Sequence, residues 1–131
     1  ENDSLYNTPP CYAIYIVKLV LEWVKGLGGL AAVEKRNEEK GSMLYGTMDG
    51  LKDFYKGTVD PRSRSLMNVT FRLPSEELEV KFIAEAKTAG FEGLKGHRSV
   101  GGVRVSMYNA FEPEGIKQLT AFMKEFAKKN G

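Results

Sequence analysis

Residues 95–109 read Lys-Gly-His-Arg-Ser-Val-Gly-Gly-Val-Arg-Val-Ser-Met-Tyr-Asn, and we expect the fold to be built around this stretch. After Gly102, apolar and polar residues alternate as far as Tyr108, which is typical of a strand with one buried face. The glycines before the strand permit positive φ values and allow the backbone to approach a ligand closely. The stretch therefore predicts a flexible loop that leads into a rigid strand over 103–108.

The loop and the strand carry cationic side chains that could bind an anion. His97 and Arg98 belong to the loop, whereas Arg104 would project from the strand. A planar guanidinium can bind a carboxylate through two hydrogen bonds, and a loop can close on a second negative group. The spacing thus suits a small molecule with two anionic ends. A basic loop that merely faces solvent is the alternative.

Two helices are expected before the strands. Apolar residues recur at helical spacing over a wide arc of 12–24, which indicates a helix buried on more than one side. A second helix is predicted over 29–48. Its charged residues from Glu34 to Lys40 are mixed in sign and spaced for pairing along the helix, so we expect them to face solvent.

Further strands and helices complete the predicted fold. Alternation predicts a strand over 66–73, and shorter strands are expected at 54–57 and 91–94. Ser75 is a good N-cap for a third helix, and Glu112-Pro113 opens a fourth. We therefore predict an α/β protein of the two-layer α+β kind, in which helices pack on one face of a small, largely antiparallel sheet.

The composition excludes several classes of protein. A chain of 131 residues can form one domain with its own core, and a net charge of +2 is too small to indicate a nucleic-acid or membrane partner. The single cysteine, Cys11, excludes an internal disulfide, fits a reducing compartment and is expected to be packed. With one histidine besides, no metal site is expected. No signal-peptide pattern opens the chain, so we expect a cytoplasmic protein.

Asn7-Thr8-Pro9-Pro10 is a second candidate anion site. Thr8 is a suitable N-cap, and Pro9 suits the first helical position, where no backbone donor is needed. Unpaired backbone N–H groups at a helix start favour a phosphate, and Asn7 adds an amide donor. Thr8 as an ordinary cap without a ligand is the alternative. No nucleophile-and-base set accompanies these anion sites.

Three stretches together resemble the phosphoserine aminotransferase family: residues 7–10, 64–72 and 95–110. The similarity is to the C-terminal part of these proteins and covers essentially all of the chain. It implies a fold-type I, pyridoxal-phosphate-dependent homodimer. Such an enzyme exchanges an amino group between glutamate and 3-phosphohydroxypyruvate, which gives 2-oxoglutarate and O-phosphoserine in serine biosynthesis. Bacterial members often serve pyridoxine biosynthesis as well.

The resemblance also implies roles for particular residues. Arg104 would bind the α-carboxylate of the substrate. His97 and Arg98 would lie at the substrate pocket, where a phosphate or a side-chain carboxylate binds. Asn7 and Thr8 would reach across the dimer to the cofactor phosphate of the neighbouring subunit.

The resemblance divides the chain into a preceding segment, residues 1–11, and a small domain, residues 12–131. The family's large domain, with the lysine that forms the Schiff base, would lie before residue 1. We therefore expect a C-terminal fragment that holds no catalytic residue and does not transaminate alone. A free-standing anion-binding module is one alternative. A protein-interaction domain that uses the apolar face of residues 12–24 is another.

Overall fold

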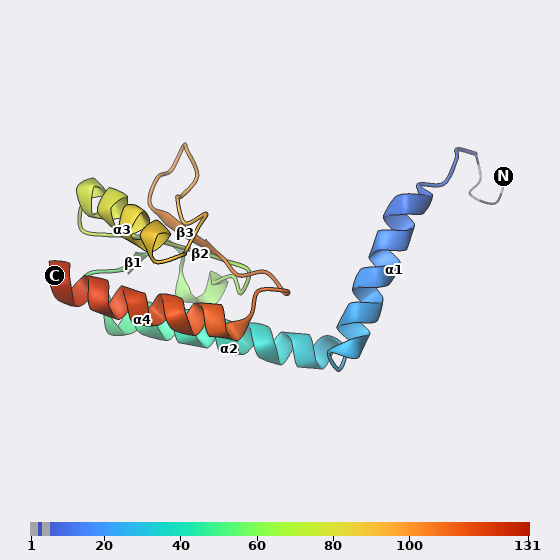
Figure 1. Ribbon diagram of the computed structural model, residues 1–131, viewed down its shortest axis with the longest axis horizontal. Coiled ribbons are helices and arrows are strands. Elements are labelled where there is room, and N and C mark those ends of the chain that lie inside the picture. Colours follow the sequence, from blue (N-terminus) through green and yellow to red (C-terminus); the bar gives the residue numbers. More distant parts are fainter. Residues whose placement is uncertain (1–2, 4–5) are drawn as a thin grey trace. The chain divides into compact units, whose positions relative to one another are not determined.

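The computed structural model describes residue 3 and residues 6–131 of the chain, and it divides into two compact units (Figure 1). The first unit is Glu1–Lys35, and the second is Arg36–Gly131. Helix α1 (Cys11–Gly26) and the start of α2 (Leu30–Gly50) belong to the first unit. The rest of α2 and all later elements belong to the second, which carries the sheet and the loop of residues 95–102.

Helix α1 begins later than the sequence suggests. Its N-cap is Pro10, no side chain caps it, and the N–H of Cys11 donates to the carbonyl oxygen of Pro9 at 2.8 Å. The prediction that Thr8 is the N-cap is therefore wrong. The cause is local, because a residue that precedes proline is disfavoured in the helical conformation, and Pro9 precedes Pro10.

None of the α1 side chains is buried in the structure. The expectation that this helix is covered on more than one side is therefore not met by these 131 residues, and Cys11 is exposed rather than packed. Among the residues that the structure describes, no helix is long and apolar enough to cross a membrane. The exposed apolar side chains of α1 are Tyr12, Ile14, Tyr15, Ile16, Val17, Leu19, Val20, Leu21 and Trp23.

Three short antiparallel strands form the sheet of the second unit, in the order β1-β2-β3. They are β1 (Lys56–Gly57), β2 (Asn68–Arg72) and β3 (Val103–Ser106), with a 3-10 helix, η2 (Pro61–Ser63), between the first two. Strands β2 and β3 pair from Asn68 opposite Ser106 to Phe71 opposite Val103. The predicted strands at 54–57, 66–73 and 103–108 are confirmed, each in a shorter form.

The strand expected at 91–94 is absent from the structure, and nearby only Lys95 forms an isolated bridge, to Val103. Gly90 and Gly93 have φ values of 93° and 73°, which interrupt the extended backbone. Apolar residues around a glycine with positive φ can be buried without forming a ladder. Leu94 is buried in this way.

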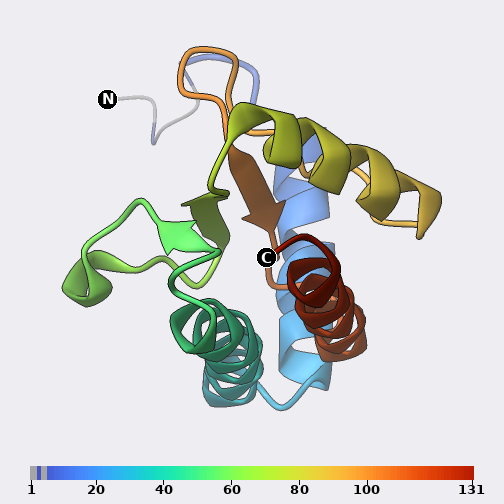
Figure 2. The same cartoon turned by 90° about the vertical axis from the view of Figure 1, so that its left-hand side faces the viewer.

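Helices α3 (Glu76–Thr88) and α4 (Pro113–Asn130) lie with residues 36–50 of α2 on one side of the sheet (Figure 2). The Ser75 side chain accepts from the N–H of Leu78, so the predicted N-cap of α3 is confirmed. Aromatic rings join the layers: Phe82 packs edge-on against Phe71 of β2 and Phe126 of α4, with ring centroids 6.0 and 5.1 Å apart. The predicted two-layer α+β fold is confirmed.

Lys40 is the clearest departure from the predicted pattern. It was expected to face solvent, yet it is completely buried, and its Nζ donates to the carbonyl oxygens of Met107 at 3.0 Å and Tyr108 at 2.7 Å. Burial, together with the nearby charge of Arg36, lowers the pKa of Lys40. Arg36 is itself paired with Glu112 at 2.6 Å. These contacts fasten the chain that follows β3 to helix α2.

Candidate functional site

The cationic loop, residues 95–102, is closed by its own backbone. The N–H of Gly96 donates to the carbonyl oxygen of Gly102 at 2.9 Å, and the N–H groups of Val100 and Gly101 donate to that of His97 at 3.0 and 2.8 Å. Gly101 and Gly102 have φ values of 75° and 71°, which favour glycine. A side chain at Gly96 would collide with the carbonyl of Gly101. The predicted need for glycine here is therefore accounted for by the backbone.

His97 and Arg98 are both exposed at the turn of this loop. The Nδ1 of His97 lies 2.7 Å from the Oγ of Ser99 and 3.3 Å from the N–H of Ser99. Because a backbone N–H can only donate, Nδ1 accepts, and the neutral ring carries its proton on Nε2. His97 therefore presents a donor away from the loop.

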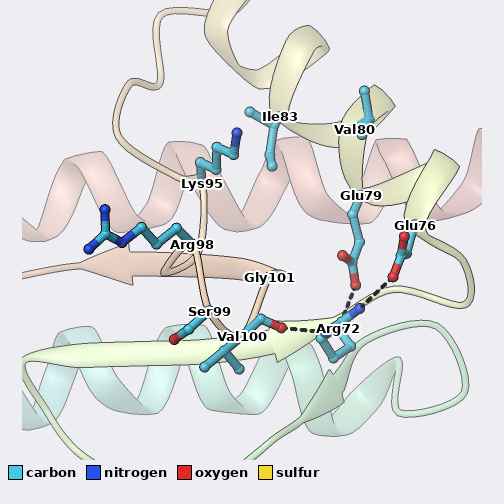
Figure 3. Close-up of a pocket in the computed structure, with 11 residues that line it drawn as sticks. Arg72, Glu76, Glu79, Val80, Ile83, Lys95, Arg98, Ser99, Val100 and Gly101 are labelled. Carbon is cyan, nitrogen blue, oxygen red and sulfur yellow. Dashed lines mark hydrogen bonds and ion pairs between the residues drawn. The ribbon is translucent and has the colours of Figure 1, made fainter.

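Arg98 lines a shallow hollow of about 380 Å³ at the side of the loop. Figure 3 shows that its guanidinium points away from Arg72 and Glu79, which lie at the other end of the same hollow. No carboxylate oxygen of residues 3 and 6–131 lies within 4.0 Å of a guanidinium nitrogen of Arg98, so Arg98 forms no ion pair there. Its charge is thus available to an external anion.

Arg104 lies on β3 opposite Thr70, half-buried, on the face of the sheet away from the aromatic core. Its Nε is buried and has no hydrogen-bond partner in the described part of the chain, nor is its guanidinium in an ion pair there. A buried donor without a partner is uncommon in folded proteins, so this nitrogen calls for a partner such as a ligand, a water molecule or another chain.

A separate hollow of about 430 Å³ opens beside Arg104. Its lining is mostly apolar, which strengthens the interaction of a lone guanidinium with an anion because the local dielectric constant is low. Residues that line it besides Arg104 include Phe91, Leu94, Ser106, Tyr108, Phe111 and Leu119. Arg104 and Arg98 therefore come from one continuous loop and strand but line two different hollows, and His97 lines neither.

Asn7 and Thr8 belong to the first unit, just before α1. Both are exposed, and neither side chain bonds to another described residue. The backbone here is poorer in donors than the sequence suggested, because Pro9 and Pro10 have no N–H and that of Cys11 is used. Anion binding at this end would thus depend on the Asn7 and Thr8 side chains and on the N–H groups of Tyr12 and Ala13, which form no hydrogen bond within the described residues.

The sequence reasoning missed Arg72 and Glu79, which support the loop. The Nε of Arg72 donates to Oε1 of Glu79 at 2.6 Å, and its Nη1 donates to the carbonyl oxygen of Val100 at 2.8 Å. Glu79 is buried although it is a charged residue in the first turn of α3. Two features of the sequence could have indicated this pair: the acidic first turn of α3, and an arginine seven residues before Glu79.

The sequence model of the family described as "Aminotransferase class-V" matches residues 1–119 of the chain. The chain belongs to the class-V aminotransferase family. The predicted resemblance to the phosphoserine aminotransferases is also confirmed. This class-V chain is 58% identical over its full length to the phosphoserine aminotransferase of Desulfatibacillum aliphaticivorans and 56% identical to that of Syntrophobacter fumaroxidans.

Solved structures agree with this assignment of the class-V chain. The phosphoserine aminotransferase of Bacillus circulans subsp. alkalophilus superposes with a TM-score of 0.91 at 51% identity, over 99% of the chain. The pyridoxal-phosphate-bound phosphoserine aminotransferase of Trichomonas vaginalis superposes with a TM-score of 0.83 at 36% identity, over 94%. The chain spans only about a third of these proteins, 36% and 35% of their lengths, and 36% of the two curated relatives.

Proposed function

We propose that these 131 residues are the C-terminal, substrate-binding part of a pyridoxal-phosphate-dependent phosphoserine aminotransferase, with residues 1–11 preceding a small domain of residues 12–131. The full protein would transfer the amino group of glutamate to 3-phosphohydroxypyruvate, which yields 2-oxoglutarate and O-phosphoserine. The observation that carries the proposal is the half-buried guanidinium of Arg104, which is unpaired among the described residues, in a chain so similar to these enzymes. Serine biosynthesis, and in some organisms pyridoxine biosynthesis, would be the pathway served.

Arg104 would bind the α-carboxylate, which all four reactants carry. Its position on a paired strand fixes the direction of the guanidinium before the substrate arrives, and such preorganisation reduces the entropy lost on binding. The mostly apolar lining of the hollow lowers the local dielectric constant and so strengthens the ion pair.

His97 and Arg98 would bind the other anionic end, a phosphate in one pair of reactants and a side-chain carboxylate in the other. Because glutamate and O-phosphoserine are both doubly ended anions, the same two groups of residues, which line different hollows in these 131 residues, can serve both halves of the exchange. The exposed Nε2–H of His97 and the unpaired guanidinium of Arg98 are suitable donors for either group.

Pyridoxal phosphate, when bound, supplies the electron sink that amino transfer requires. The side chains of Asn7 and Thr8 fit a place at its phosphate, because both are exposed and neither is bonded to another described residue. We propose that the full protein is a cytoplasmic homodimer. In it, Asn7 and Thr8 would hold the phosphate of the cofactor that is bound to the neighbouring subunit. The lysine that forms the Schiff base would lie in the part of the full protein that corresponds to the stretch of its relatives outside this chain.

The proposal is tested with the intact protein that carries these residues. Purified with pyridoxal phosphate, it should form more than one equivalent of 2-oxoglutarate per active site from glutamate only when 3-phosphohydroxypyruvate is present. The isolated 131-residue chain, assayed beside it, should show neither turnover nor the absorption band of a Schiff base. Turnover by the isolated chain would contradict the inference that these residues are inactive alone. An inactive intact protein that nevertheless binds O-phosphoserine would favour the free-standing anion-binding alternative.

A further inference from the structure

Arg72 connects three elements that are distant in sequence. It ends β2, and its two bonded nitrogens point to α3 and to the cationic loop, as Figure 3 shows. The bond from Nε to Oε1 of Glu79 is 2.6 Å long, and the bond from Nη1 to the carbonyl oxygen of Val100 is 2.8 Å long. Glu76 lies 3.8 Å from Nη2 and adds a second, weaker negative partner.

Glu79 is fixed as firmly as the arginine that it holds. Only 8% of its side chain is exposed, and the same Oε1 accepts the N–H of Leu73 at 3.3 Å. A buried carboxylate requires paired donors, because an isolated charge in the interior is strongly unfavourable. Arg72 is therefore held in one orientation, and the bond that it sends to Val100 comes from a rigid support.

The loop is shaped to lie against this arginine. A Cβ atom at Gly102 would come within 2.7 Å of Cδ of Arg72 and 2.9 Å of the carbonyl oxygen of Phe71. A Cβ atom at Gly101 would be 3.4 Å from Nη1 of Arg72. Close approach to Arg72 and Phe71, besides positive φ, thus explains Gly102, whereas Gly101 is explained by its positive φ.

We propose that Arg72 and Glu79 are positioning residues that fix the 97–101 turn, and with it His97 and Arg98, for the distal anion of the substrate. The carbonyl of Val100 is held by Arg72, while the N–H of Val100 donates to His97, so displacement of one moves the other. The role in substrate binding rests on the function proposed above for His97 and Arg98. The immobilisation of the turn does not.

An arginine is required because the two bonds leave in different directions. Nε and Nη1 belong to one rigid plane, whereas the ammonium of a lysine is a single point that cannot occupy both positions. Arg72→Lys therefore retains the charge opposite Glu79 and loses the directed bond to Val100. Arg64→Lys is the matched control, because Arg64 is also paired with a carboxylate, Asp49, on an element that does not touch the loop.

The first test is hydrogen exchange in the intact, cofactor-loaded protein. Arg72→Lys should accelerate exchange of the Val100 and Gly101 amides about tenfold or more, since a hydrogen bond to a charged group contributes on that scale. Exchange of the Val105 amide within the sheet should stay the same, which excludes general unfolding, and Arg64→Lys should leave the turn unchanged. Glu79→Gln, which keeps an acceptor oxygen, should give a smaller acceleration. Unchanged turn exchange in Arg72→Lys would overturn the proposal.

The second test compares two amino donors. For O-phosphoserine, Arg72→Lys should lower kcat/KM about tenfold through KM, whereas for L-alanine, which has no distal anion, the value should stay within about twofold. Equal losses for both donors would mean a merely structural role and would contradict the proposal. If the unmodified protein proves inactive, the proposed function fails, while the exchange experiment still decides whether Arg72 fixes the turn.

Discussion

Lys40 donates a hydrogen bond of 2.7 Å to the carbonyl oxygen of Tyr108, from a helix that is 68 residues earlier in the sequence. The same Nζ donates to Met107, and the neighbouring Asn37 donates from Nδ2 to Oδ1 of Asn109 at 2.8 Å. The strand that carries Arg104 is thus fastened at its outgoing end. On the incoming side, Arg72 fastens the loop that leads into it. We infer that both ends of the anion-binding segment are held by side chains from other elements.

Lys40→Met should destabilise the fold by about 2 kcal/mol, because a side chain of similar length remains but two carbonyl oxygens lose a charged donor. Chemical denaturation of the 131-residue chain measures this loss. Lys35→Met, at an exposed position of the same helix, is the control and should change the free energy of unfolding by less than about 0.5 kcal/mol. Equal effects of the two substitutions would mean that the bonds of Lys40 add no net stability.

The pKa of Lys40 is lowered by burial and by Arg36, which fixes the sign of its pH dependence. Between the depressed pKa of the folded state and the ordinary value of 10.5, the unfolded chain binds more protons, so stability should rise with pH. Burial raises the pKa of Tyr55, which works in the opposite direction above its ordinary value of 10.0. The difference in unfolding free energy between the unmodified chain and Lys40→Met isolates the lysine. That difference should increase with pH, and a decrease would refute the assignment.

At low pH, the free energy of unfolding should depend on the ion pair of Asp49 and Arg64. Two hydrogen bonds of 2.6 and 2.7 Å from Arg64 lower the pKa of Asp49, so its contribution is present above 3.8 and is lost as pH falls through the folded-state pKa. More than half of the Asp49 side chain is exposed, and solvent screening therefore limits the effect to less than about 1 kcal/mol. Asp49→Asn should abolish this component in acid denaturation curves; curves of identical slope would argue against it.

Much of the fold is predictable from local patterns. Alternation identified β3, the Ser75 cap identified α3, and the run from Pro113 identified α4, because each depends on residues adjacent in sequence. The helix start at Cys11 was misplaced because the effect of one proline on another outweighed the capping preference of Thr8. The missing strand at 91–94 shows a similar local override by two glycines.

The site was only partly predictable. Lys40 comes three residues after Asn37 and four before Leu44, and both of these are buried. Residues at this spacing share one face of a helix, so the pattern could have indicated that Lys40 is buried despite its charge. The link between Arg72 and Val100 could not be read locally, because it depends on how the chain returns after α3. Whether Arg104 has a carboxylate partner is likewise a tertiary property. Its residue type and strand position predict the chemistry, but only the packing leaves the guanidinium without a partner in the part of the chain that the structure describes.

The most direct test of the carboxylate-binding role of Arg104 is kcat/KM for glutamate in the intact protein with Arg104→Gln. Glutamine removes the charge and keeps a side chain of similar length. Arg62→Gln, at a site where the side chain is 90% exposed, is the control. We predict that Arg104→Gln loses about 3 kcal/mol of transition-state binding, more than a hundredfold in kcat/KM, while the control stays unchanged. A value for Arg104→Gln within about twofold of the unmodified protein would contradict the assignment of Arg104 as the carboxylate-binding residue.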